Sequence, residues 1–297
     1  MAESHKNLEF SRNLLAMAFL DLKVARYLHD GGYYPHAVFY LEQSVEKGLK
    51  SYSIALGIID EKEAWREISH KTLKIYEKTT KNFRERVVNV QENLKMIPNL
   101  EAFFKQYVNF TEIVKQLDET IEQIKSFSKQ DENSLYITKE ELKKTIKTID
   151  DLNREAKSVK VKNQSKSITP SEFRNSKKFI IDMLEAVLAN QPERLRQEKE
   201  ELNRNFTSES YEEKMKGAIS QSIPPMVLFQ SFFQLSIILQ PHAFARYPKA
   251  DFNPIEFYSP DLPLIKSFTK LADITERVLN QVDESYRKYE EVPRVSS

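Results

Sequence analysis

Residues 99–169 contain neither proline nor glycine. These two residue types are the strongest local breakers of helices, so a stretch of this length without them can form long, uninterrupted helices. Glycine is scarce throughout, since only 5 of the 297 residues are glycine and four of those five lie before residue 60. Folds rich in β-turns need more glycine than this, so the pattern predicts an all-α fold.

Apolar residues inside this stretch follow an alternating four-three spacing, which is typical of a coiled-coil seam. The first series comprises Phe103, Tyr107, Phe110, Val114, Leu117, Ile121 and Ile124. Thr138 and Glu141 then form a capping box that predicts the start of a second helix. We therefore expect an antiparallel, coiled-coil-like helical hairpin near residues 99–160. It either packs within the chain or serves dimerisation or partner binding.

The N-terminal part predicts two helices that pack closely against each other. The first ends near Asp30, and the second has Pro35 in its first turn. Gly48 lies inside the second helix, where glycine costs about 1 kcal/mol relative to alanine, so a neighbouring helix is expected to approach closely there. Further helix starts are expected at Asp60 with Glu63, at Thr169-Pro170 with Glu172, at Pro192, after Pro224-Pro225, and at Ser259-Pro260.

Charge and residue usage exclude several functions. The 45 Lys and Arg residues balance 44 Asp and Glu residues, so the net charge of +1 gives no global attraction to nucleic acid or anionic membranes. The absence of cysteine removes thiol nucleophiles, cysteine-based zinc sites, iron–sulfur ligation and disulfides. No Walker A, GxGxxG, HExxH or GxSxG motif is present. We expect no metal and no cofactor.

The sequence predicts a cytoplasmic protein that does not associate with membranes. The N-terminus has neither a basic nor an apolar signal-peptide region. The most apolar stretch, residues 227–239, is too short to span a bilayer and is interrupted by polar residues. We interpret it as a buried core helix.

Three segments carry a recognisable ordered pattern. The first covers the opening helical pair and comprises Asp21, Ala25, Gly32, Tyr33, Ala37, Phe39, Gln43, Glu46, Lys47 and Lys50. The second is Ser69-His70-Lys71-Thr72-Leu73, and the third is Ala245-Arg246-Tyr247-Pro248. They resemble, in turn, the opening helices, the His-Asp-Leu element and the Arg-Tyr-Pro element of the HEPN family (higher eukaryotes and prokaryotes nucleotide-binding domain). The second segment lacks the acidic residue of the family.

The resemblance implies an up-and-down helical bundle made of residues 1–79 and 220–297. Residues 80–219 would then be an inserted helical region that contains the hairpin arm. It also implies a nucleotide or RNA as ligand, a homodimer, and a separately encoded nucleotidyltransferase as a conceivable partner.

Many members of this family are metal-independent ribonucleases with an Arg-x4-6-His motif. Histidine moves protons at the 2′-hydroxyl and the leaving oxygen, while arginine neutralises charge on the phosphoryl group. Here only three residues separate Arg66 from His70, one fewer than the motif requires. In the other pair the order is reversed, because His242 comes before Arg246. The sequence therefore favours binding without cleavage.

Candidate site residues follow from the same resemblance. The nucleotide-binding candidates are Arg26, Lys47, Lys50, His70, Arg246 and Tyr247. A divergent ribonuclease would instead bring Arg66, His70, His242 and Arg246 together across the bundle or a dimer interface. Solvated lysines, structural ion pairs and a packed histidine are the alternatives for these residues, and a protein-interaction scaffold that uses the arm is a third function.

Overall fold

The computed structural model describes residues 2–96, 101, 104–105, 109–128, 135–165, 169–249 and 251–291. In these residues the structure is helical, and the one β feature is an isolated bridge between Lys249 and Phe252. The expected all-α fold is confirmed. Phe103 and Tyr107 of the predicted seam lie outside the described residues.

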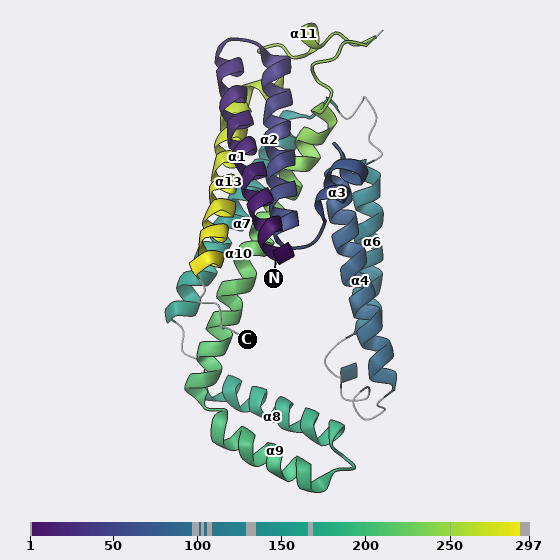
Figure 1. Cartoon of the computed structure of the whole chain (residues 1–297), viewed down its shortest axis with the longest axis vertical. Coiled ribbons are helices and arrows are strands. Elements are labelled where there is room, and N and C mark those ends of the chain that lie inside the picture. The colour runs from purple at the N-terminus through teal and green to yellow at the C-terminus, as the bar shows by residue number, and fades with distance from the viewer. Residues whose placement is uncertain are drawn as a thin grey trace. The chain divides into compact units, whose positions relative to one another are not determined.

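The helices, labelled as in Figure 1, have the following bounds. They are α1 (Ala2–Asp30), α2 (Tyr34–Ala55), α3 (Glu61–Glu63), the π-helix η1 (Ala64–Ile68), α4 (Leu73–Lys95), α6 (Phe110–Ser128), α7 (Lys139–Ser165), α8 (Pro170–Val187), α9 (Pro192–Asn205), α10 (Ser208–Leu239), the 3-10 helix η3 (Gln240–His242), α11 (Pro254–Phe257), α12 (Pro263–Lys266) and α13 (Phe268–Glu291). Within the described chain, no helix combines the length and the apolar character needed to cross a bilayer.

The chain forms two compact units. The bundle unit takes in residues 1–79, 123–153 and 226–297, and the arm unit takes in residues 80–122 and 154–225. Residues 123–153 thus pack with the two terminal segments, although the sequence places them in the insertion. The proposed division at residues 80 and 219 stays a prediction.

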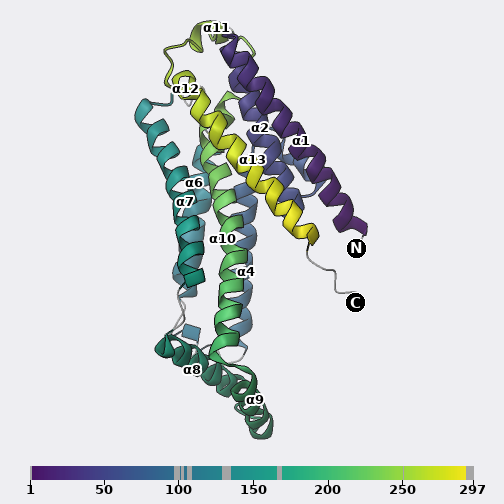
Figure 2. The same ribbon diagram turned by 90° about the vertical axis from the view of Figure 1, so that its left-hand side faces the viewer.

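In the bundle unit, α1, α2 and α13 lie side by side (Figures 1 and 2). The apolar residues of α1 recur every three or four positions, which puts them on one helical face. They share a single buried core with residues of α2, α10 and α13, among them Leu15, Leu22, Leu41, Leu49, Phe232, Leu271 and Val278. Burial of this core provides the main driving force for folding of the unit.

Gly48 marks the closest approach of helices in this core. A Cβ atom on Gly48 would lie 2.4 Å from Leu279 Cδ2 and 3.1 Å from Phe232 Cε1. Both neighbours are fully buried, so neither could move away freely. The close approach expected at Gly48 is confirmed, and it explains why α2 tolerates the cost of an internal glycine.

Local helix starts agree with the sequence at the capping boxes and differ at two proline-containing segments. Side-chain caps are present at Asp60 with Glu63, at Thr138 with Glu141, and at Thr169 with Glu172. However, α10 runs through Pro224 and Pro225 instead of starting after them. Likewise, the last long helix begins at Phe268, because Ser259 and Pro260 lie in a turn ahead of the short α12.

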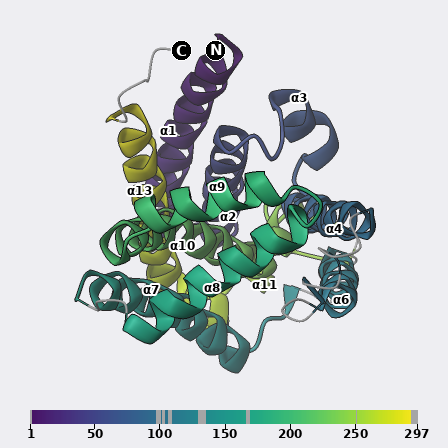
Figure 3. The same cartoon turned by 90° about the horizontal axis from the view of Figure 1, so that it is seen from below.

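In the arm unit, α4 lies beside α6 as an antiparallel pair (Figures 1 and 3). Arg84 Nε donates to Asp118 Oδ1 at 2.6 Å across this pair. By contrast, α7 bonds to α13 within the bundle unit, where Arg277 Nη2 donates to Asp150 Oδ1 at 2.9 Å. This pairing differs from the hairpin expected near residues 99–160.

Candidate functional site

A largely buried cluster of charged and polar side chains is centred on α2. We call it the α2 cluster, and it comprises Asp21, Glu42, Gln43, Glu46, Lys47, Lys50 and His70. Charged residues are seldom buried unless they are paired, because leaving water costs several kcal/mol per ion. The side chain of Lys50 is only 1% exposed. Its burial shows that the cluster is part of the packed interior and is not a solvated lysine face.

Glu46 is the centre of the α2 cluster. Its Oε1 accepts a hydrogen bond from Lys50 Nζ at 2.6 Å. Its Oε2 accepts from Gln43 Nε2 at 3.0 Å and lies 2.7 Å from His70 Nδ1. Both carboxylate oxygens are therefore occupied, which is the condition for burying an ionised carboxylate.

Two further carboxyl groups complete the electrostatics of the cluster. Burial, and then the charge of Glu46, raise the pKa of Glu42 well above its ordinary value. Burial also raises the pKa of Asp21, although the ion pair with Lys47 opposes this effect. Gln43 Nε2 donates to Glu42 Oε2 at 2.8 Å, so the amide links the Glu42 and Glu46 carboxyl groups.

His70 lies in the turn between η1 and α4, on the solvent side of the cluster. Its side chain is 41% exposed, and its ring meets the Phe244 ring edge-on at 5.8 Å. The preceding residue, Ser69, has φ 46°, a conformation that is strained for a residue other than glycine. Strained backbone persists only where the surrounding structure holds it in place, and it is often found at functional sites.

Arg246 and its neighbours form the second part of the site. The Arg246 guanidinium lies 4.0 Å from the centroid of the Phe39 ring of α2 and 4.9 Å from that of Tyr247. Its Nη2 donates to the Tyr247 hydroxyl at 2.8 Å, while its buried Nε has no partner among the described residues. Phe244 contacts His70, and Arg246 contacts Phe39 of α2. The loop that carries Phe244 and Arg246 therefore lies against α2, beside the α2 cluster.

The predicted site residues divide into those that the structure brings together and those that it does not. His70, Lys47 and Lys50 share the α2 cluster, and Arg246 and Tyr247 lie on the adjoining loop. Lys50 is fully buried, so its ammonium stabilises Glu46 and is not presented to a ligand.

Arg26, Arg66 and His242 lie apart from this group. Arg26 forms ion pairs with Asp273 and Glu276 of α13, both at 2.9 Å. Arg66 is exposed on η1. The helix capped by Asp60 continues there as a π-helical turn, and no hydrogen bond between Arg66 and His70 is seen in the described structure.

His242 is completely buried, and its Nδ1 lies 2.7 Å from the Tyr258 hydroxyl. Desolvation lowers its pKa to about 3. The imidazole thus acts in the core of the bundle and is not presented to a substrate.

Sequence reasoning missed two aromatic side chains at the edge of the α2 cluster. Phe244 and Trp65 are each about half exposed, and Lys50 Nζ lies 5.0 Å from the centroid of the Trp65 ring. No sequence signal pointed to Trp65. Phe244 lies two residues before Arg246, so a search for aromatic residues next to the Arg-Tyr-Pro element could have found it.

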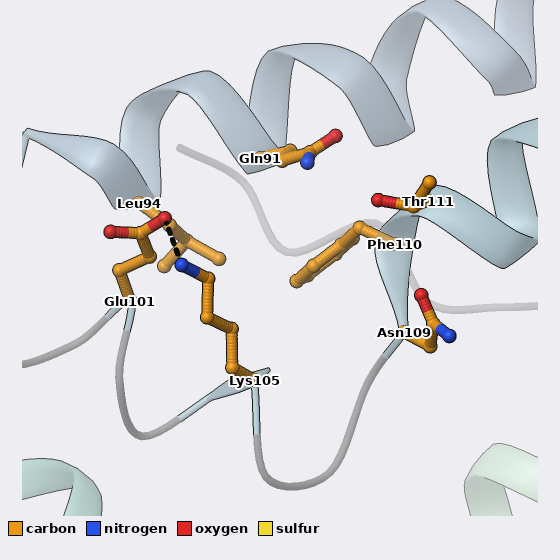
Figure 4. Close-up of a pocket in the computed structure, with 7 residues that line it drawn as sticks. All are labelled: Gln91, Leu94, Glu101, Lys105, Asn109, Phe110 and Thr111. Carbon is orange, nitrogen blue, oxygen red and sulfur yellow. Dashed lines mark ion pairs between the residues drawn. The ribbon is translucent and has the colours of Figure 1, made fainter.

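The described residues of this site do not form a metal centre. Among the described residues, no group of three or more His, Asp or Glu side chains could hold a metal ion. A cavity of about 300 Å³ lies in the arm unit, lined by side chains that include Leu94, Glu101, Lys105 and Phe110 (Figure 4). Lys105 and Glu101 pair across it at 2.8 Å, so its charges are already matched.

Comparison with known proteins identifies the family. The sequence model of the HEPN domain matches residues 11–188, which is more than half of the chain. The chain belongs to the HEPN domain family. The region matched by the family model extends through α8. It therefore includes residues that the sequence assigns to an insertion.

A relative from Methanocaldococcus jannaschii, named "Putative toxin MJ1304", is 29% identical over 152 residues. The alignment covers 48% of this chain and 95% of the relative. No solved structure matches the chain.

Proposed function

We propose that this HEPN-family protein binds a nucleotide or single-stranded RNA at an exposed surface beside the α2 cluster. We call it the His70 surface, and it comprises Trp65, His70, Phe244, Arg246 and Tyr247. The observation that carries the proposal is the state of Arg246, which is held in place by aromatic rings without a carboxylate partner in the described part of the chain. Such a guanidinium is ready to pair with a phosphate.

The other basic candidates are already neutralised. Arg26 pairs with α13, Lys47 pairs with Asp21, and Lys50 pairs with Glu46. An anionic ligand would have to break these ion pairs before it could bind there. Arg246 needs no such exchange, and the Phe39 ring beneath it fixes the plane of its guanidinium.

Three aromatic side chains provide stacking surfaces on the His70 surface. Trp65, Phe244 and Tyr247 are each about half exposed. Single-stranded nucleic acids are commonly bound by stacking of bases on such rings, with about 1–3 kcal/mol per stacked base. A cation beside exposed rings therefore favours a ligand that carries both phosphate and bases.

Replacing Arg246 with alanine is expected to weaken RNA binding by about ten- to a hundredfold, because charged hydrogen bonds contribute about 1.5–3 kcal/mol. Fluorescence anisotropy with a labelled single-stranded oligoribonucleotide at low salt measures this, since phosphate contacts weaken as salt rises. Arg277→Ala is the matched control, because Arg277 is already paired with Asp150. Equal affinity of the wild type and the Arg246 variant would contradict the proposal.

A second candidate function is metal-independent cleavage of RNA, and the contact between Glu46 and His70 favours it. A histidine held by a carboxylate through Nδ1 is the arrangement that general acid–base catalysis uses. The relative from Methanocaldococcus jannaschii is named a toxin, and such an activity is compatible with that name.

Cleavage of labelled RNA in the presence of EDTA tests the second function. If it occurs, His70→Ala should reduce the rate by about a hundredfold or more. His36→Ala should leave the rate unchanged, because His36 is exposed and forms no contact with the α2 cluster in the described structure. Cleavage that survives the His70 substitution would rule out this role. The homodimer and the nucleotidyltransferase partner stay predictions.

A further inference from the structure

The contact between Glu46 and His70 determines which ring nitrogen faces a ligand. An ionised carboxylate has no proton to donate, so the 2.7 Å contact requires Nδ1 of His70 to be the donor. In a neutral imidazole the other nitrogen, Nε2, is then a hydrogen-bond acceptor. No described residue bonds to Nε2, and the His70 side chain is 41% exposed.

Glu46 cannot turn away from His70, because its neighbours hold it. Lys50 Nζ bonds to Oε1 at 2.6 Å and Gln43 Nε2 bonds to Oε2 at 3.0 Å. Gln43 is itself fixed by Glu42 and also lies 3.4 Å from His70 Nδ1. Since the amide and a protonated Nδ1 are both donors, this last approach is a packing contact, and Glu46 remains the acceptor for both.

The charges of the α2 cluster balance without a charge on His70. Asp21 is matched by Lys47, and Glu46 is matched by Lys50. The remaining carboxyl group, Glu42, is fully buried beside Gln43. Burial raises the pKa of Glu42, which favours its uncharged form, so the cluster does not require the imidazole as a counter-ion.

We infer that Glu46 is a positioning residue, which holds His70 with Nδ1 protonated so that Nε2 accepts a hydrogen bond from a ribose hydroxyl of the ligand. The inference rests on the proposed function and adds to it the kind of group that is bound. Phosphate oxygens are acceptors and cannot bond to an accepting Nε2, whereas the ribose 2′-hydroxyl can donate. In this arrangement Arg246 contacts phosphate and His70 distinguishes RNA from DNA.

The first test measures the protonation of the ring directly. At about pH 8, where an ordinary imidazole is neutral, ¹⁵N NMR should show His70 protonated at Nδ1, with the signal assigned from a His70→Gln variant. In the double variant Glu46→Gln with Lys50→Met, which removes both charges of the buried pair together, this preference should be lost. Glu67→Gln is the matched control, because Glu67 is exposed on η1 and lies outside the α2 cluster, and it should retain the preference.

Wild-type protein with His70 protonated at Nε2 would overturn the inference without any variant, so a variant that fails to fold leaves the test intact. Retention of the Nδ1 preference in the folded double variant would likewise overturn the role of Glu46.

The second test compares RNA and DNA oligonucleotides of one sequence. His70→Ala should weaken RNA binding by about tenfold, the effect of about one hydrogen bond, and leave DNA binding unchanged. The double variant Glu46→Gln with Lys50→Met should reduce the same RNA preference. Equal weakening of both ligands by the His70 substitution would overturn the assignment of a ribose hydroxyl. If neither ligand binds the wild type, the proposed function fails, while the NMR result still decides the role of Glu46.

Discussion

Replacing Lys50 with methionine is expected to lower the free energy of unfolding by about 3–5 kcal/mol, because one member of a buried ion pair is lost. Methionine fills a similar volume, so the loss is chiefly electrostatic. The Glu46 carboxylate would remain buried with Gln43 and His70 as its only partners among the described residues. Urea unfolding at about pH 7.5, where carboxylates are normally ionised, measures the change.

Two further variants separate this effect from simple loss of a lysine. Lys47→Met on the same helix should cost less, because Lys47 and Asp21 both retain some contact with solvent. Adding Glu46→Gln to Lys50→Met should recover much of the lost stability, because no uncompensated charge remains. A Lys50→Met variant within about 1 kcal/mol of the wild type would contradict the buried ion pair, since such pairs are costly to break.

Helix starts and the all-α fold could be predicted because their signals are local. A capping box such as Thr169 with Glu172 lies within four residues, and its hydrogen bonds form in the same place whatever surrounds it. The two-residue glycine turn after Asp30 is equally local, and Gly32 adopts φ 79° there.

The pairing of helices could not be predicted in the same way. The apolar seam of α6 identifies a helix that needs a partner, but it does not name the partner. The structure pairs α6 with α4, whose positions Val87, Val88 and Leu94 are half-buried or buried. Proline is a similar case, since Pro224 and Pro225 predict a helix boundary and yet lie inside α10.

The candidate site shows the same limit at the level of single side chains. Lys50 follows Glu46 by four positions, a spacing that occurs in exposed and buried ion pairs alike. The sequence therefore could not show that Lys50 is buried. The contact between Glu46 and His70 joins residues 24 positions apart and depends on how η1 places the following turn.

The stability of the protein is expected to fall in acid through His242. Its pKa is lowered to about 3 by burial, and its buried Nε2 has no partner in the described residues. In the unfolded chain the imidazole pKa returns to about 6.5, so the unfolded state binds a proton first as the pH falls. Stability is then lost from about pH 6.5 downwards, by about 1.4 kcal/mol per pH unit, until about pH 3.

Glu42 and Asp21 change stability in the opposite direction. Their pKa values are raised in the folded protein, so the folded state binds these protons first and their contribution grows as the pH falls. A His242→Gln variant isolates the histidine, because both carboxyl groups are present in the wild type and the variant. Glutamine is uncharged and can still bond to the Tyr258 hydroxyl.

We expect the stability advantage of the wild type over His242→Gln to shrink below about pH 6.5 by about 1.4 kcal/mol per pH unit. Urea unfolding between about pH 7.5 and 4.5 measures it. His36→Gln, at an exposed histidine, is the control for the substitution itself. If the stability difference between the wild type and His242→Gln did not change with pH, the His242 imidazole would be able to take up a proton within the folded core. The partner for that charge would then have to be found among the residues around Tyr258.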